Sequence, residues 1–307
     1  MRVIVVVGEQ VVDLLPAGDG LLRAALGGGP ANTAIAAARL GAEVTMLARL
    51  GKDSFGAAFR DRLARDRVDI GHLIPTAQPS ALALATVDEH GEAAYDFWLS
   101  GAADFSWRSR DLPDFSGGTR IHLGSLAAFL PPGADAIERW AASHREQCTI
   151  SFDPNLRPVA LARPDSLVRL ERLAELAHVI RVSEEDLEMA YPGVPALTTA
   201  KRWLRQGDKL IVLTRGADGA TALTADGSVQ VKAPMVSAVD TIGAGDTATG
   251  ALLVGLSEGV PLPELLAFMC AAAALNCTRV GADPPTRAEV EAFIRTSAQG
   301  TGAPTDR

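Results

Sequence analysis

Residues 240–246 read DTIGAGD, and the rest of the chain is organised around them and the small-residue run TATGALLVG that follows at 247–255. Because Gly243 and Gly245 flank Ala244, the three backbone N–H groups can turn toward one point without interference from Cβ atoms. The helix expected after them adds its dipole and its unpaired first-turn donors at that point. We therefore predict an anion-binding turn suited to a phosphate group.

The motif ends in a carboxylate, Asp246, which would repel a bound anion unless it meets a hydroxyl group that attacks that anion. This combination predicts phosphoryl transfer with Asp246 as the base. Aspartate is also a favoured N-terminal cap of helices, so the motif alone leaves an ordinary capped helix open.

Composition limits the class of protein. The chain has 307 residues, of which 48% are hydrophobic and 5% aromatic, enough for one large α/β domain. Its formal net charge of −8 argues against nucleic acid or an anionic membrane as partner and favours a small soluble ligand. Cys148, Cys270 and Cys277 lack disulfide or zinc spacing, which indicates a reducing cytoplasm. The apolar run at 3–7 is too short for a signal peptide or a membrane span.

Strand and helix patterns alternate along the chain, which is typical of a parallel sheet covered by helices. The apolar runs expected to form its strands are residues 3–7, 44–48, 121–124, 149–153, 178–182 and 209–214. No repeat or linker divides the chain. We expect a single domain over 1–297 and a flexible tail over 298–307.

Two features near the N-terminus suggest a ligand. The run at 11–15 continues extended after the first strand and carries Asp13 toward its C-terminal side, where the carboxylate either caps a turn before Pro16 or accepts hydrogen bonds from ligand hydroxyls. Residues 27–34, GGGPANTA, allow close backbone approach and open a helix, with Asn32 facing back to the glycines. Neither a GxGxxG fingerprint nor a GxxxxGK[ST] loop occurs, and an ordinary helix start stays open for this segment.

A hairpin is expected over residues 81–98, around a DEHG loop at 88–91. It gathers Tyr95, Phe97 and Trp98 in a chain poor in aromatic residues. We interpret it as a flap over a ligand; an edge hairpin whose aromatic side chains complete the core is the alternative.

Polar residues also follow later strands. Asp153, Asn155 and Arg157 come after one strand, at the edge where parallel sheets bind ligands, although a proline-bounded turn would explain them too. Residues 183–186, SEED, can cap a helix or contact magnesium through water. The RGADG segment at 215–219 has glycines that can pass a polyphosphate.

GGGPANTA and DTIGAGDT resemble the two signatures of the ribokinase-like (PfkB) carbohydrate kinase family, and together they are highly specific. GEQVVDLLP, TRGADG and TRVGADPPTRAEV resemble the fructokinase branch more than the ribokinase or adenosine kinase branches. The resemblance implies a three-layer α/β/α fold with a mainly parallel central sheet and a small β lid from residues of about 9–26 and 81–105. It implies transfer of the γ-phosphate of ATP to a primary hydroxyl of a monosaccharide, with D-fructose converted to fructose 6-phosphate.

The same resemblance assigns roles by position. Asp246 becomes the base, and the anion hole is Gly243, Ala244 and Gly245. The expected sugar contacts are Asp13, Gly28, Gly29, Asn32, Phe97, Arg157 and Asp246. The expected ATP contacts are Thr214, Gly216, Asp218, Gly219, Gly243 and Gly245.

Metal sites follow from the resemblance as well. Magnesium is expected to be held through water by Glu185 and Asp186, where SEED replaces the NxxE element common in the family and leaves open which acidic residue acts. The family often places a monovalent cation such as K⁺ beside the anion hole, here against Asp240, Ile242, Asn276 and Gly281.

The sequence leaves the sugar open. A 2-keto-3-deoxygluconate kinase would use the same core with a cation such as Arg157 for the substrate carboxylate, and a ribokinase is a further alternative. From a different class, a non-catalytic sugar-binding regulator could share the fold, although the intact Asp246 and its glycines argue against it. The resemblance also allows a homodimer formed through the lid.

Overall fold

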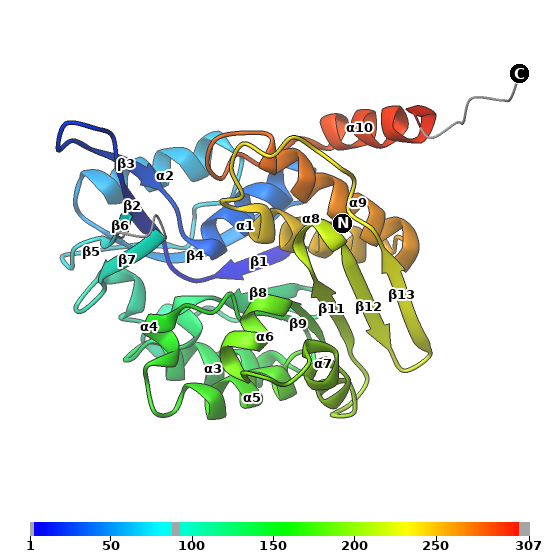
Figure 1. Ribbon diagram of the computed structural model, residues 1–307. Coiled ribbons are helices and arrows are strands. Elements are labelled where there is room, and N and C mark those ends of the chain that lie inside the picture. The colour runs from blue at the N-terminus through cyan, green and yellow to red at the C-terminus, as the bar shows by residue number, and fades with distance from the viewer. Residues whose placement is uncertain (1–2, 88–92, 301–307) are drawn as a thin grey trace, which may run out of the picture.

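A computed structural model describes residues 3–87 and 93–300 of the chain, with a sheet between two layers of helices (Figure 1). The nine strands of the sheet lie in the order β13-β12-β11-β10-β9-β8-β1-β4-β5. The strands β11 to β5 in that order run parallel, and β12 and β13 are added antiparallel at one edge. Their bounds are β1 Ile4–Val7, β4 Val44–Gly51, β5 Leu73–Thr76, β8 Arg120–Gly124, β9 Thr149–Asp153, β10 Val179–Ser183, β11 Leu210–Thr214, β12 Ala220–Thr224 and β13 Gly227–Val231. The predicted three-layer, mainly parallel fold is confirmed.

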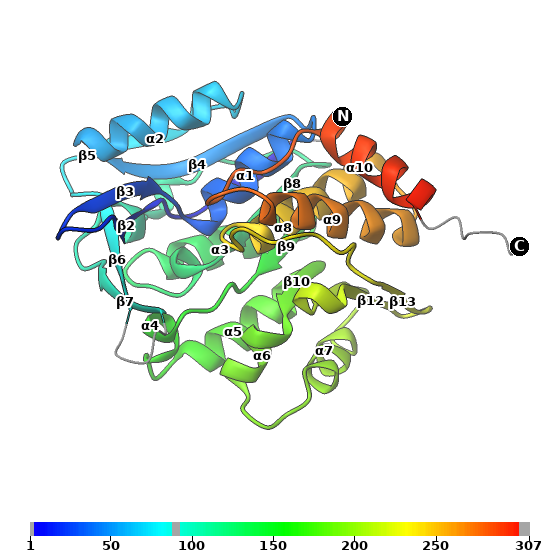
Figure 2. The same cartoon turned by 45° about the horizontal axis from the view of Figure 1, so that its top comes forward.

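Helices cover both faces of the sheet, as the two views in Figures 1 and 2 show. One layer contains α1 Gly29–Arg39, α2 Ser54–Arg65, α8 Ala244–Glu258, α9 Leu262–Cys277 and α10 Arg287–Gly300. The other contains α3 Ala134–His144, α4 Pro158–Leu161, α5 Ser166–Leu176, α6 Glu184–Ala190 and α7 Ala196–Leu204. Short 3-10 turns are η1 Ala103–Phe105, η2 Ser109–Asp111, η3 Leu126–Ala128 and η4 Gly216–Asp218.

The position of strand β1 inside the central sheet explains why its sequence is continuously apolar. Its side chains alternate between the two cores of the molecule: Ile4 and Val6 pack in the core with α1, α8 and α9, whereas Val5 and Val7 pack in the core with α3 and α5. All four are at most 1% exposed, because a central parallel strand is covered on both faces.

A second, four-stranded sheet lies beside the central one and forms the lid (Figure 1, left). Its order is β3-β2-β6-β7, with β2 Val11–Pro16, β3 Leu22–Leu26, β6 Ala81–Val87 and β7 Ala93–Trp98. The predicted hairpin is therefore present as β6 and β7, while its loop at 88–91 lies outside the described residues.

The strand at 11–15 is separate from the first central strand. Strand β1 ends at Val7, and Asp13 lies mid-strand in β2, within the segment that the resemblance places in the lid. The chain leaves the central sheet at Glu9, whose carboxylate accepts hydrogen bonds from the backbone of Leu126 and Ala127. Helix α10 extends through Gly300, three residues into the segment expected to be a flexible tail, and the remainder of that segment lies outside the described residues.

The length and composition of the helices bear on a membrane location. Within residues 3–87 and 93–300, none of the helices combines the length and the apolar character that a membrane span needs.

Candidate active site

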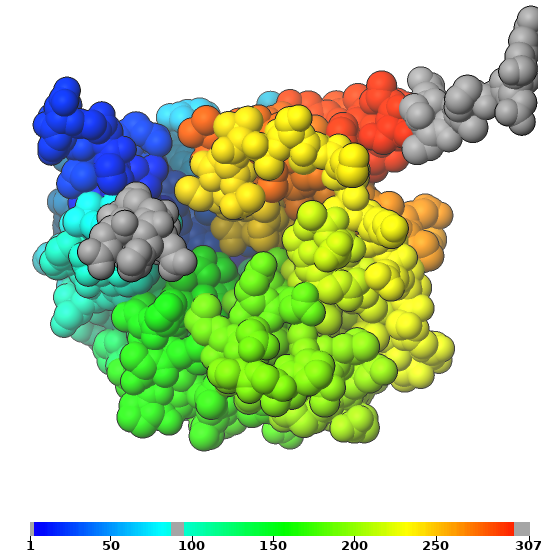
Figure 3. Space-filling view, viewed as in Figure 1, coloured from blue at the N-terminus to red at the C-terminus, as the bar shows by residue number. Residues whose placement is uncertain are grey.

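A cavity of about 380 Å³ lies between the lid sheet and the start of α8. Figure 3 shows the surface hollowed between the lid, coloured blue and cyan, and the loop before α8, coloured yellow. The cavity joins segments far apart in sequence: β2 and β7 of the lid, the start of α1, the turn after β9 and the start of α8. Sequence-predicted residues that line it are Asp13, Gly28, Gly29, Asn32, Phe97, Asn155, Arg157, Asp240, Ile242, Gly243, Gly245, Asp246 and Gly281.

The anion-hole turn begins helix α8. Gly243 is its N-cap, with φ +76°, and a Cβ there would lie 2.6 Å from the Cβ of Ala282. Glycine is therefore required by both the left-handed backbone and the packing. The Ala244 N–H already donates to the Thr241 carbonyl at 3.2 Å, so its donation to a bound anion stays a prediction. Gly243 and Gly245 line the cavity.

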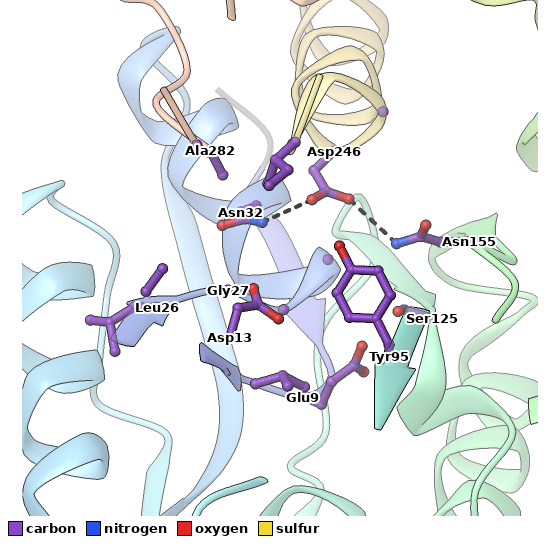
Figure 4. A pocket seen from close by; sticks show the side chains of 18 of the residues that line it. Glu9, Asp13, Leu26, Gly27, Asn32, Tyr95, Ser125, Asn155, Asp246 and Ala282 are labelled. Carbon is purple, nitrogen blue, oxygen red and sulfur yellow. Dashed lines mark hydrogen bonds between the residues drawn. The ribbon is translucent and has the colours of Figure 1, made fainter. Parts of the chain in front are cut away.

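Asp246 is the third residue of α8, not its cap, so an ordinary capping role for this carboxylate is wrong. Its Oδ2 accepts a hydrogen bond from Asn32 Nδ2 at 2.9 Å, and its Oδ1 accepts one from Asn155 Nδ2 at 3.5 Å (Figure 4). Burial raises the pKa of Asp246 to about 6 against the opposing effect of the Asn32 hydrogen bond, and the nearby charge of Asp153 raises the pKa further. A carboxylate with this pKa is charged at neutral pH and able to accept a proton.

Asp13 faces the same cavity from lid strand β2. Burial raises its pKa to about 6, and the charge of Arg157 opposes that shift. A partly desolvated carboxylate of this kind gains stability by accepting hydrogen bonds from ligand hydroxyls.

The glycine run at the start of α1 lets the backbone lie close to the side chains of Asn155 and Asp246. Gly28 has φ +99°, and a Cβ on Gly29 would lie 2.5 Å from Asn155 Nδ2 and 3.2 Å from Asp246 Oδ1. Any side chain at position 29 would therefore displace the groups that hold Asp246. Helix α1 then places Asn32, one turn in, against the carboxylate.

The lid aromatics divide between two faces of β7. Tyr95 and Phe97 line the cavity with their ring centroids 6.1 Å apart, whereas Trp98 points away and is 54% exposed. Phe97 packs against the core, but Tyr95 is 46% exposed and does not complete it. The flap interpretation fits this arrangement better than the edge-hairpin alternative.

The residues expected to contact ATP lie elsewhere. Thr214 ends β11 and accepts a hydrogen bond from buried Arg181 at 2.7 Å, and Gly216–Asp218 forms the turn η4. Among the described residues that line the cavity, only Gly243 and Gly245 belong to the expected ATP set. The other four lie at the end of strand β11 or directly after it: Thr214, Gly216, Asp218 and Gly219.

Of the two residues expected to contact magnesium, Asp186 has hydrogen-bond partners at both carboxylate oxygens. Asp186 forms a capping box with Ser183, and its other carboxylate oxygen accepts the Leu156 N–H at 2.7 Å. Glu185 is exposed beside it. Within the described part of the chain, no cluster of three or more His, Cys, Asp or Glu side chains could hold a metal ion directly. Contact through water stays a prediction.

The residues expected to hold a monovalent cation come together. Asp240 accepts the N–H groups of Ile242 at 2.9 Å and Gly281 at 2.8 Å, while Asn276 Nδ2 donates to the Ile242 carbonyl at 2.8 Å. The buried Asn276 Oδ1 has no hydrogen-bond partner in residues 3–87 and 93–300. This concentration of oxygen acceptors fits a cation.

A model of the pfkB family of carbohydrate kinases matches residues 1–289, nearly the whole chain. The chain belongs to this family. A fructokinase from Klebsiella pneumoniae is 35% identical over 261 residues, which cover 83% of this chain and 85% of that protein.

Solved kinases share the architecture of this pfkB family member. A fructokinase from Vibrio cholerae O395 in its fructose, ADP and calcium ion bound form superposes with a TM-score of 0.87 at 30% identity, over 95% of this chain and 99% of that one. An aminoimidazole riboside kinase from Salmonella enterica, complexed with aminoimidazole riboside and an ATP analogue, gives 0.86 at 27% identity, over 95% and 100%. The central sheet and lid described above are thus the fold of this carbohydrate kinase.

The cavity of this pfkB kinase is also lined by residues that the sequence did not assign to the site, among them Glu9, Tyr95 and Ser125. Tyr95 could have been found from its period-two spacing to Phe97. Glu9 is 1% exposed and its pKa is raised by burial, but its partners lie more than a hundred residues away. Ser125, with φ +53°, has no local sequence signal.

Proposed function

We propose that this chain is an ATP-dependent sugar kinase that transfers the γ-phosphate of ATP to a primary hydroxyl of a monosaccharide, and that the substrate is D-fructose, giving fructose 6-phosphate. One observation carries the proposal: the Asp246 carboxylate is held by Asn32 at a glycine anion-hole turn, inside a cavity that also receives Asp13 from the lid. The fructokinase relatives support the choice of sugar.

In this proposal Asp246 accepts the proton late in the reaction. Its pKa of about 6 lies about 10 units below that of a water-like alcohol, about 16, so deprotonation beforehand would cost about 14 kcal/mol. As the bond to phosphorus forms, the hydroxyl becomes acidic. Asp246 therefore orients the hydroxyl first and takes its proton afterwards.

The anion-hole turn stabilises the transferred group. The backbone donors at Gly243 and Gly245, with the first turn of α8 behind them, meet the negative charge of the migrating phosphoryl group. Glu185, exposed in the first turn of α6, would hold magnesium through water, and that ion would supply neutralisation of the ATP phosphate charge. Asp240, Asn276 and the carbonyl of Ile242 would hold a monovalent cation, which would supply positive charge next to the same turn.

The sugar is recognised from the lid and the body together. Asp13 accepts hydrogen bonds from the sugar hydroxyls, and Asn32 donates to them. Phe97 covers the carbon face of the sugar. Arg157 lines the cavity as well, which favours one second candidate, a 2-keto-3-deoxygluconate kinase whose substrate carries a carboxylate. The Arg157 Nη1 donates to the carbonyl of Leu156 at 2.8 Å, which leaves its other donors for such a group.

An ADP-release assay distinguishes these candidates. Fructose, ribose, 2-keto-3-deoxygluconate and adenosine are offered with ATP and magnesium, and fructose is expected to give the highest kcat/KM. Turnover only with the sugar acid would favour the second candidate. ADP release with none of the four would contradict the kinase proposal and favour a non-catalytic regulator.

The proposal also includes a cellular location and an assembly state. The three cysteines are unpaired thiols, in line with a cytoplasmic location. Leu21, Leu22 and Trp98 expose apolar surface on the lid, which supports a homodimer through that sheet. Light scattering would test it: the wild type is expected at dimer mass and Trp98→Glu at monomer mass.

A further inference from the structure

Arg62, on helix α2, lies outside the cavity and contacts residues that line it. Its Nη1 donates to the carbonyl of Leu26, and its Nη2 donates to Asn32 Oδ1 at 3.3 Å and to the carbonyl of Ala282 at 3.0 Å. All three partners line the cavity, whereas Arg62 itself is not among the lining residues that the structure describes. One guanidinium thus joins the end of lid strand β3, helix α1 and the loop after α9.

The contact with Asn32 fixes which way its amide faces. A guanidinium only donates hydrogen bonds, so it selects the oxygen of the amide. The Nδ2 group of Asn32 is then left to donate to Asp246 Oδ2 at 2.9 Å. Figure 4 shows the Asn32 oxygen turned away from Asp246 and its nitrogen turned toward it. A cation on one side and an anion on the other therefore hold the amide in a single orientation.

Packing of α2 does not account for this arrangement. The helix is anchored by its buried residues Gly56, Phe59 and Leu63 and capped by Asp53, whose side chain accepts from Gly56 N. Arg62 is partly buried, and desolvation lowers its pKa, so its charge is placed there against a solvation cost. Other charges around it are Asp66, Arg39 and Asp283, which pair with one another.

We propose that Arg62 is a positioning residue for phosphoryl transfer: it orients the Asn32 amide so that Asn32 holds the Asp246 carboxylate, and it ties lid strand β3 to the same point. This inference rests on the kinase function proposed above. It adds a residue on α2, outside both signature motifs, to the machinery that places the base. The position of lid strand β3 and the alignment of the base are then linked through one side chain.

The test compares Arg62→Met with Arg65→Met, an exposed arginine one turn further along the same helix. We expect Arg62→Met to lower kcat with fructose by about tenfold to a hundredfold, the size of effect that a small displacement of a reacting group produces. The KM for ATP and the melting temperature should change little, and Arg65→Met should match the wild type. Equal kcat values for Arg62→Met and Arg65→Met would overturn the proposal.

A double-mutant cycle shows whether Arg62 acts through Asn32. If it does, adding Arg62→Met to Asn32→Ala lowers kcat no further than Asn32→Ala alone. Independent, multiplicative losses would contradict the proposed route.

A second measurement needs no turnover. The charged and titratable groups facing Asp246 are Asp153 on β9, Arg157 after it, Arg181 on β10 and His122 on β8. With these unchanged, loss of Arg62 removes a positive charge and loosens the Asn32 donor, and both effects raise the pKa of Asp246. A ¹³C titration of the Asp246 carboxyl, identified by its absence in Asp246→Asn, should show a higher midpoint in Arg62→Met than in the wild type.

The two measurements separate failure of this inference from failure of the kinase proposal. A wild type that releases no ADP with any sugar contradicts the kinase function, and the titration then still decides whether Arg62 positions Asp246. An unchanged midpoint, with an active wild type, overturns only the role of Arg62.

Discussion

Asp246 and Asp13 share one cavity, and burial raises the pKa of each to about 6, yet they stand on different parts of the molecule. Asp246 belongs to the body, on the first turn of α8, and two asparagine side chains hold it. Asp13 belongs to the lid, in the middle of β2, and the structure gives its carboxylate no such donors among the described residues. The comparison indicates that the body presents a carboxylate already oriented for chemistry, while the lid presents one that a ligand must satisfy.

The first prediction concerns the body. Asp246→Asn keeps the shape and removes the proton acceptor, so kcat should fall by about 10²- to 10⁴-fold while sugar affinity changes little. Turnover is measured by ADP release and affinity by calorimetry. Asp208→Asn, at an exposed position, should retain wild-type kcat. Near-normal turnover in Asp246→Asn would contradict the role of Asp246 as the proton acceptor.

The second prediction concerns the turn that precedes the base. Gly243→Ala must place a Cβ 2.6 Å from that of Ala282 at φ +76°, so the turn shifts and donors are lost. Loss of one such donor typically lowers kcat by about 10²- to 10³-fold. Gly259→Ala is the matched control, because Gly259 ends the same helix at φ +72° with no atom within 4 Å of the added Cβ. Gly259→Ala should lose about 1 kcal/mol of stability and Gly243→Ala more, because only its Cβ clashes, and only Gly243→Ala should lose activity.

The third prediction concerns the lid. Asp13→Ala removes a charged acceptor of sugar hydroxyls, an interaction worth about 1.5 to 3 kcal/mol, so the KM for sugar should rise about 10- to 100-fold. The KM for ATP should stay at the wild-type value. Asp96→Ala, at an exposed position on strand β7 of the same sheet, is the control. A change in ATP affinity with an unchanged sugar KM would reverse the role given to Asp13.

The fourth and smallest effect is on pH dependence. Activity requires Asp246 as the carboxylate, and its folded-state pKa is raised to about 6, so activity is present above that pH and is lost as pH falls through it. At saturating sugar, kcat at pH 5 should be about a tenth of its value at neutral pH. A flat profile of kcat between pH 5 and pH 7 would contradict the role of Asp246.

Sequence alone predicted the body half of the site better than the lid half. The anion-hole turn and the start of α1 were recognisable because their requirements are local: glycines for a left-handed turn, then a helix. The apolar run at 11–15 does not itself reveal which sheet Asp13 joins, and only the family resemblance placed this segment in the lid. Glu9 could not be assigned either, because the backbone donors of Leu126 and Ala127 come from the distant turn η3.

Arg62 shows the same limit more sharply. Its position on α2 looks like an ordinary solvent-facing residue of an amphipathic helix, and only the fold brings it beside Leu26, Asn32 and Ala282. Contacts of this kind depend on how elements pack, which periodicity does not encode. The chemistry-bearing motifs were therefore predictable, and the residues that hold them in place were not.

The central claim is that base, anion hole and lid together phosphorylate a sugar. ³¹P NMR of the wild-type protein with ATP, magnesium and D-fructose tests it most directly, because it detects the product and not only the loss of ATP. A new phosphomonoester signal that coincides with added fructose 6-phosphate is expected, and it should form at least about a hundredfold more slowly with Asp246→Asn. Release of inorganic phosphate alone, or no consumption of ATP, would contradict it.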